Sequence, residues 1–204
     1  MRSLPPHLQF GLLTDVTELN LGRNEITGTM PSEIGRMTKL VTGGSYGLVR
    51  ENQLTGSLPT ELGNLQIKSG VLFYYNGLSQ TIPTQLGRLT ALATALALQR
   101  NVLSGTLPTQ LGSLAATTEL VVGSHPCNEY SVSQKCPSCM AYDDFGACIQ
   151  VPESSFSGSL PTQLGRLSAL TRFELKARCS TTEKPVVSPL HPTAPLLRIA
   201  THLC

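Results

Sequence analysis

Leu107-Pro108-Thr109-Gln110-Leu111-Gly112 is one copy of a phrase that recurs along this chain of 204 residues. In each copy an apolar residue and a proline are followed by two polar residues, an aliphatic residue and a glycine. The prolines of the five good copies lie 28, 24, 25 and 53 residues apart, and the copies occupy residues 30–35, 58–63, 82–87, 107–112 and 160–165. A partial copy begins at Leu4. A repeat of about 24 residues predicts an array of stacked units, and such arrays usually bind other macromolecules.

A second phrase precedes each proline, as in residues 19–28 and 96–105, with the form Leu-x-Leu-x-x-Asn-x-Leu-x-Gly. Its alternating leucines predict a short strand with one buried and one free face. An asparagine at the turn after the strand can satisfy unpaired backbone groups, so we expect a ladder of stacked asparagines. The glycine indicates a close approach of coils or an unusual backbone dihedral, and the proline is expected to open a short helical turn. The predicted ladder residues are Asn24, Asn52, Asn76 and Asn101, and the glycines are Gly28, Gly56, Gly105 and Gly158.

Joined together, the two phrases read LxxLxxLxLxxNxLxGxLPxxLGx and resemble the plant-type leucine-rich repeat family. The resemblance covers about residues 4–175 apart from an interruption after His125. It implies an α/β solenoid, a right-handed coil with a short-strand parallel sheet on the concave face and an irregular or 3-10 helical convex side. Proteins of this family include receptor ectodomains that recognise peptides and secreted inhibitors of cell-wall hydrolases.

The interruptions of the repeat suggest four segments. Residues 1–125 form the first part of the array with an uncapped start, and residues 126–148 form a cysteine-rich insertion. Residues 149–178 carry the last repeats, and residues 179–204 form a proline-rich tail that we expect to be extended and disordered. The chain opens within a repeat and without a hydrophobic leader, which favours a fragment of a longer protein. The resemblance implies a cell-surface or secreted location, whereas a complete chain without a leader would be cytoplasmic.

The insertion contains four cysteines, and two more lie in the tail at Cys179 and Cys204. If the protein is secreted, an even number of cysteines in one loop favours two disulfide bonds. Free thiols or a non-native segment remain an alternative, as does a zinc site, although zinc ribbons usually have two close cysteine pairs and this stretch has one. The cysteines of the insertion are Cys127, Cys136, Cys139 and Cys148.

Composition and motifs argue against several function classes. The net charge of +2 and 14% charged residues do not indicate a nucleic-acid binder, and no apolar stretch is long enough to span a membrane. Gly43-Gly44-Ser45-Tyr46-Gly47 has the G-x-S-x-G form of a hydrolase nucleophile, but it falls in an overlong repeat, and no histidine is placed to act as its base. We therefore predict a protein that is not an enzyme and that has no cofactor and no metal site.

The variable positions around each Leu-x-Leu core are the candidate ligand-binding residues, because they fall on the free face of the strand. Mixed charge and aromatic side chains suit a protein or peptide ligand, and tyrosine offers large contact area with little rotamer entropy. These residues could equally do no more than cover the sheet. The candidates are Glu18, Asn20, Arg23, Arg50, Glu51, Leu72, Tyr74, Tyr75, Gln99, Arg100, Arg172, Glu174 and Lys176.

Three functions are compatible with these features. The first is a non-catalytic protein- or peptide-recognition module that forms part of a receptor-like signalling protein at the cell surface. The second is a secreted inhibitor of a hydrolase that uses the same face and has oxidised cysteines. The third is an intracellular scaffold, for which the cysteines would be reduced.

Overall fold

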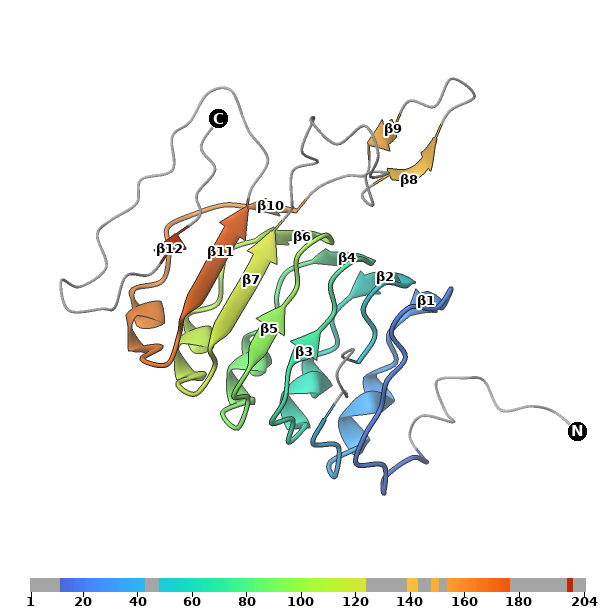
Figure 1. Ribbon diagram of the computed structural model, residues 1–204, viewed down its shortest axis with the longest axis horizontal. Helices are drawn as coiled ribbons and strands as arrows, with labels where there is room; N and C mark the ends of the chain where they lie inside the picture. Colours follow the sequence, from blue (N-terminus) through green and yellow to red (C-terminus); the bar gives the residue numbers. More distant parts are fainter. Residues whose placement is uncertain are drawn as a thin grey trace, which may run out of the picture.

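The repeats stack side by side into a solenoid, as Figure 1 shows for the computed structural model. The structure describes residues 12–42, 48–123 and 154–176, together with the backbone of short strands at 139–142, 148–150 and 198–199. A typical coil contains two short strands and one 3-10 helix. The predicted leucine-rich-repeat-like α/β solenoid is therefore confirmed.

One parallel sheet contains the Leu-x-Leu strands. It is formed by β3 (Val71–Leu72), β5 (Ala95–Ala97), β7 (Glu119–Gly123), β11 (Arg172–Lys176) and β12 (Arg198–Ile199), in the order β12-β11-β7-β5-β3. We call it the concave sheet. Leu96, Leu120 and Phe173 are paired in its register and buried beneath it, as the period-two alternation predicts. In the first coil, a single bridge between Glu18 and Thr42 stands in place of a strand.

A second parallel sheet was not predicted from the sequence. It consists of β1 (Thr27–Thr29), β2 (Gln53–Ser57), β4 (Gly77–Gln80), β6 (Val102–Gly105) and β10 (Ser155–Phe156), in that order. The segment after each asparagine forms this sheet, in which Leu54, Leu78 and Leu103 are buried. Glycine, which recurs in these strands, is a poor strand former, so the pairing depends on stacking rather than on local propensity. Outside the solenoid, β8 (Cys139–Tyr142) and β9 (Cys148–Gln150) pair as antiparallel strands.

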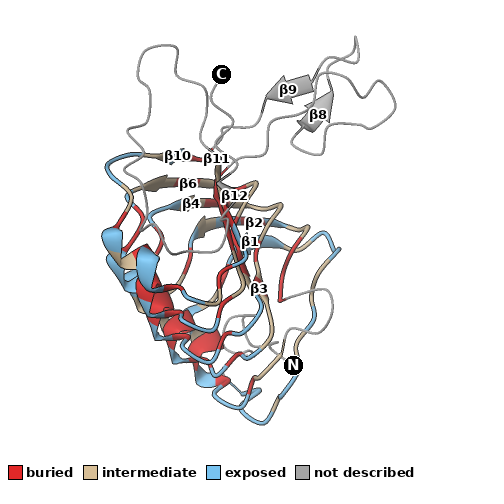
Figure 2. Ribbon diagram, turned by 60° about the vertical axis from the view of Figure 1, so that its left-hand side comes forward, coloured by how far each residue is buried: buried red, intermediate tan, exposed pale blue. Residues whose placement is uncertain are grey.

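The third side of the coil consists of 3-10 helices, each preceded by the proline of the repeated phrase (Figure 2). The prolines have extended backbones with φ between −61° and −72° and serve as N-caps, so the missing proline N–H removes no helical hydrogen bond. The aliphatic residue of the phrase points into the core, where Leu62, Leu86 and Leu111 are almost completely buried. The helices are η1 (Ser32–Arg36), η2 (Thr60–Asn64), η3 (Thr84–Arg88), η4 (Thr109–Ser113) and η5 (Thr162–Arg166).

The glycine that closes each phrase lets neighbouring helices touch. A Cβ atom on Gly87 would collide with the carbonyl oxygen of Gln110 in the next coil, and Gly63 faces Gln85 in the same way. Gly165 has the same place in the last helix but is exposed. The apolar core runs continuously from Met30 in the first coil to Phe173 in the last. Contact between backbones of successive coils is therefore a property of the inner repeats.

Replacing this glycine tests the close stacking. We expect Gly87→Ala to lower the free energy of unfolding by about 2 kcal/mol, because a backbone oxygen must shift to admit the methyl group. Gly165→Ala is the matched control and should change stability by less than about 0.5 kcal/mol, since nothing needs to move at an exposed position. Urea denaturation followed by circular dichroism measures both values. Equal effects of the two substitutions would contradict this account.

A column of left-handed residues runs through the second sheet, with Gly28, Gly56, Gly105 and Gly158 at φ between 76° and 86°. The predicted unusual dihedrals are thus present. In the third coil the position belongs to Gln80, whose φ is 67°. A Cβ atom on Gly56 would lie 2.8 Å from a methyl group of Thr29, and one on Gly105 would lie 2.8 Å from that of Thr81. By the same repeat geometry Gln80 faces Ser57, which lacks this methyl group. The side chain that replaces glycine at position 80 therefore has room, because serine replaces threonine at position 57.

The compensation can be measured by a double-mutant cycle. Ser57→Thr should destabilise the protein by about 1–2 kcal/mol, because the new methyl group meets the Cβ atom of Gln80. Gln80→Gly should stabilise it by up to about 1 kcal/mol through relief of left-handed strain. In the Gln80→Gly background Ser57→Thr should cost almost nothing. Additive changes in the urea midpoint would show that the two residues are not coupled.

Candidate ligand-binding surface

The residue before each ladder asparagine projects from the end of the concave sheet. Arg23, Glu51, Tyr75 and Arg100 hold this position in successive coils, and all are left-handed, with φ between 55° and 61°. The N–H of each donates to a carbonyl of the next coil, over 2.9 Å from Arg23 to Arg50 and 2.8 Å from Arg100 to Gly123. Inter-coil hydrogen bonds therefore hold an unfavourable backbone conformation, and the four side chains form a row that we call the strand-end row.

Asparagines lie directly behind this row. The Oδ1 atom of Asn76 accepts from the backbone N–H of Leu54 at 3.1 Å, while its Nδ2 atom donates to the carbonyls of Val49 and Phe73 at 3.0 and 3.1 Å. Asn52 and Asn101 make equivalent bonds one coil away on either side. Each of these side chains thus joins its own turn to the preceding coil.

The ladder ends differently at its two sides. Asn24 is exposed and donates to the carbonyls of Leu21 and Gly22 within its own turn. After Asn101 the next place is taken by Ser154, whose buried hydroxyl accepts from the N–H of Leu103 at 3.2 Å and donates to the carbonyl of Asn101 at 2.7 Å. The sequence reasoning missed Ser154, because the slot next in the repeat period is His125, which lies outside the described residues.

Removing an inner asparagine should be far more damaging than removing the outer one. Asn76→Ala leaves the N–H of Leu54 without its partner and removes one of the two asparagine donors from the carbonyls of Val49 and Phe73. We expect a loss of about 3 kcal/mol in the free energy of unfolding. Asn24→Ala is the matched control and should lose about 1 kcal/mol or less, because water can replace its bonds. Chemical denaturation of the two variants provides the comparison. Similar losses of stability in the two variants would show that hydrogen bonds between coils are not the main contribution of the asparagines to folding.

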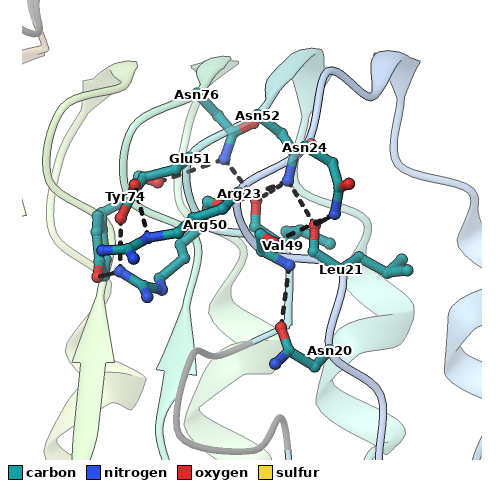
Figure 3. A network of polar contacts seen from close by, with 11 residues as sticks. Asn20, Leu21, Arg23, Asn24, Val49, Arg50, Glu51, Asn52, Tyr74 and Asn76 are labelled. Carbon is teal, nitrogen blue, oxygen red and sulfur yellow. Dashed lines mark hydrogen bonds and ion pairs between the residues drawn. The ribbon is translucent and has the colours of Figure 1, made fainter.

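An ionic network joins the first half of the strand-end row (Figure 3). One carboxylate oxygen of Glu51 contacts Nε of Arg23 at 3.1 Å, and the other contacts Nη1 of Arg50 at 2.5 Å. Arg50 also donates to the hydroxyl of Tyr74 and lies 5.5 Å from the centre of that ring. Both oxygens of Glu51 are therefore occupied by arginines.

Arg50 differs from the sequence-based expectation. It was predicted on the exposed face, but its exposed fraction is 6%. The guanidinium is covered because it lies between Glu51 and the ring of Tyr74, and a charge can be buried when it is paired and hydrogen-bonded. In this structure Arg50 supports Tyr74 and Glu51 rather than presenting its own charge to solvent.

Two tyrosines occupy the middle of the surface. The rings of Tyr74 and Tyr75 meet edge to face with centroids 5.6 Å apart, and the guanidinium of Arg100 lies 4.3 Å from the centre of the Tyr75 ring. Burial raises the pKa of the Tyr75 hydroxyl above its ordinary value, so this group is neutral at physiological pH. Burial also lowers the pKa of Arg100, which nevertheless stays cationic. The result is an aromatic centre with a cationic edge.

A second charged group lies on β11. Arg172 contacts Glu174 at 2.7 Å and Glu119 of β7 at 3.4 Å, and its hydrogen bond to Glu174 raises the pKa of the guanidinium. Glu119 was not among the predicted residues, although it occupies the repeat position of Glu18 and Arg172. The other predicted positions lie on the same side. Glu18 and Asn20 are exposed, Leu72 and Gln99 are half-buried, and the side chain of Lys176 lies outside the described part.

The cysteines predicted to form disulfides fall outside the side chains that the structure describes, and so does Ser45. Within the described ranges 12–42, 48–123 and 154–176, no group of three or more histidine, cysteine, aspartate or glutamate residues could hold a metal ion. No helix in the described part of the chain is long and apolar enough to cross a membrane.

Comparison with known proteins shows which family the chain resembles. A model of the Leucine Rich Repeat matches residues 15–37. The ectodomain of the plant membrane receptor kinase GASSHO1/SCHENGEN3 from Arabidopsis thaliana, solved in complex with CASPARIAN STRIP INTEGRITY FACTOR 2, is 26% identical over 83% of this chain, with a TM-score of 0.59. This chain resembles leucine-rich repeat proteins of the plant type in sequence and in fold. No curated protein sequence matches it.

Two further leucine-rich repeat structures share the fold. The Arabidopsis receptor kinase HAESA, solved with the peptide hormone IDA and the co-receptor SERK1, is 23% identical over 85% of this chain, with a TM-score of 0.50. A protein of Leptospira interrogans is 22% identical over 83%, with a TM-score of 0.56. The chain spans 16% of the GASSHO1/SCHENGEN3 chain, 28% of the HAESA chain and 33% of the Leptospira chain. Solenoids of this kind are protein-interaction scaffolds and are typically non-catalytic.

Proposed function

We propose that this protein recognises a protein or peptide ligand with its concave sheet, and that the strand-end row and Tyr74 form the centre of the contact. By this proposal the chain is the recognition part of a receptor-like protein. Two of the similar structures, those of GASSHO1/SCHENGEN3 and HAESA, are receptor kinases solved with a peptide hormone or a named factor. They support the proposal by analogy of fold, while the residues of this chain supply the argument for the surface.

The observation that carries the proposal is a contrast between two left-handed columns. In the second sheet, four of five left-handed positions are glycine, the residue that tolerates this conformation best. In the strand-end row none of the four is glycine, although each non-glycine residue costs about 1 kcal/mol in this conformation. Strain retained at one column and relieved at another supports a role for the side chains themselves.

The chemistry of the row favours a polypeptide ligand. Two adjacent tyrosines provide flat apolar area with a polar tip, and arginines on both sides add directional donors. Tyrosine and arginine are, together with tryptophan, enriched among the energetic centres of protein interfaces. Their side chains are already ordered by contacts with Glu51 and with each other, so less rotamer entropy is lost on binding.

The proposal is tested with peptides selected from a random display library on the wild-type protein. Tyr75→Ala should weaken binding of the selected peptides by at least about 30-fold, as expected for an interface centre. Tyr75→Phe keeps the ring and should retain most of the affinity. Thr84→Ala, on the opposite side of the coil, is the control and should bind like wild type. Fluorescence anisotropy measures the affinities.

Two results would contradict the proposal. One is full binding by Tyr75→Ala in a folded protein, as judged by its circular dichroism spectrum. The other is loss of binding in Thr84→Ala, which would place the contact on the helical side of the solenoid.

A further inference from the structure

Asn76 and Gly77 form the only Asn-Gly pair in the chain. Asparagine is one of the thermally labile residues of proteins, and a following glycine has no side chain to shield its backbone nitrogen from the asparagine amide. The other inner asparagines of the ladder, Asn52 and Asn101, are followed by glutamine and valine, whose side chains hinder this approach. One position of the ladder therefore carries a reactive pair, and the positions on either side of it do not.

The coil that contains this pair is held less firmly than its neighbours. β4 begins at Gly77 and ends at Gln80, the non-glycine residue in the described left-handed column of the second sheet. In the concave sheet, β3 spans two residues, whereas β5 spans three and β7 spans five. The N–H of Tyr75 donates to the next coil at 3.2 Å, against 2.8 to 2.9 Å for the other residues of the strand-end row. Local opening begins in the least stable parts of a fold, so we expect it in this coil.

We propose that Asn76 is a site of spontaneous deamidation that depends on local opening of its coil, and that the conversion separates this coil from the preceding one. The backbone nitrogen of Gly77 attacks Cγ of Asn76 and loses its proton, and Nδ2 leaves as ammonia. Water then opens the cyclic imide and leaves aspartate or isoaspartate at position 76. The inference is independent of the proposed function, because it concerns the scaffold behind the strand-end row.

The closed ladder opposes this reaction. Nδ2 of Asn76 donates to the carbonyls of Val49 and Phe73, and Oδ1 accepts from the N–H of Leu54. The leaving nitrogen is the donor of two of these bonds, so the reaction requires that both of them break. The side chain is also half-buried, which limits the access of water to it. Conversion therefore proceeds from the locally opened state.

The product cannot re-form the same ladder. A carboxylate accepts hydrogen bonds and donates none, so the carbonyls of Val49 and Phe73 lose one of their two asparagine donors and meet a negative charge in its place. Isoaspartate also adds a methylene group to the backbone directly before β4, which displaces this strand relative to β2 and β6. Conversion thus makes a transient opening of the coil permanent.

The experiment follows position 76 by mass spectrometry in protein that is kept in isotopically labelled water at mildly alkaline pH. Asn101 is the matched control in the same sample, because its side chain makes the equivalent bonds. In urea Asn76 should convert at least about tenfold faster than Asn101, and in the folded protein about tenfold more slowly than in urea. Gly77→Ala should remove the difference between the two asparagines. Gly77 is not left-handed, so alanine can replace it without backbone strain.

Gln80→Gly tests the dependence on opening. By relieving the strain at the end of β4, this substitution should slow conversion of Asn76 in the folded protein by up to about fivefold and leave the rate in urea unchanged. In aged wild type under native conditions, a nonspecific protease should digest the converted fraction at least about tenfold faster than the unconverted fraction. Circular dichroism checks that each variant is folded.

Four results would overturn the inference. Equal rates at Asn76 and Asn101 in urea would show that the pair is not selectively reactive. Equal rates in urea and in the folded wild type would show that the ladder does not protect the amide. An unchanged rate in folded Gln80→Gly would show that opening of β4 does not limit the reaction. Equal digestion of the converted and unconverted fractions would show that the two coils stay joined.

Discussion

Hydrogen bonds between successive coils are the interaction on which the rest of this structure depends. A single coil exposes backbone N–H and carbonyl groups at the end of its strand, and it cannot satisfy them internally. The side chain of Asn76 serves a carbonyl of its own coil and two groups of the preceding one, and the backbone of the strand-end row bonds to the following coil. Unsatisfied buried groups of this kind are costly, so one coil is stable only within a stack.

The same bonds create the candidate binding surface. They hold Arg23, Glu51, Tyr75 and Arg100 in a left-handed conformation that these residues would not choose in isolation. Because the conformation repeats, the side chains leave the sheet at the same place in each coil and lie in a row. The scaffold therefore determines where side chains project, while their identities determine what they contact.

Charge is distributed unevenly along that row. Glu51 pairs with Arg23 and Arg50, and Arg50 in turn donates to the hydroxyl of Tyr74. These three charged groups therefore support an aromatic side chain. Arg100 lies one coil beyond this network and is held by Tyr75 instead. Within the described residues, the arginines at one end of the row are paired with a carboxylate, and the arginine at the other end is held by an aromatic ring.

The sequence by itself determined the period, the strands of the concave sheet, the proline before each helix and the glycines at φ near 80°, because these depend on backbone chemistry that is local to one repeat. Tertiary structure decided three other features: the second sheet, the place of Ser154 at the end of the asparagine ladder, and the burial of Arg50. Each of them arises from contacts between residues some 24 to 53 positions apart, as for Arg50 with Tyr74 and Ser154 with Asn101. A repeat pattern predicts which positions become neighbours, but the charge, shape and hydrogen-bonding capacity of the particular neighbour decide whether a side chain is exposed, buried or paired.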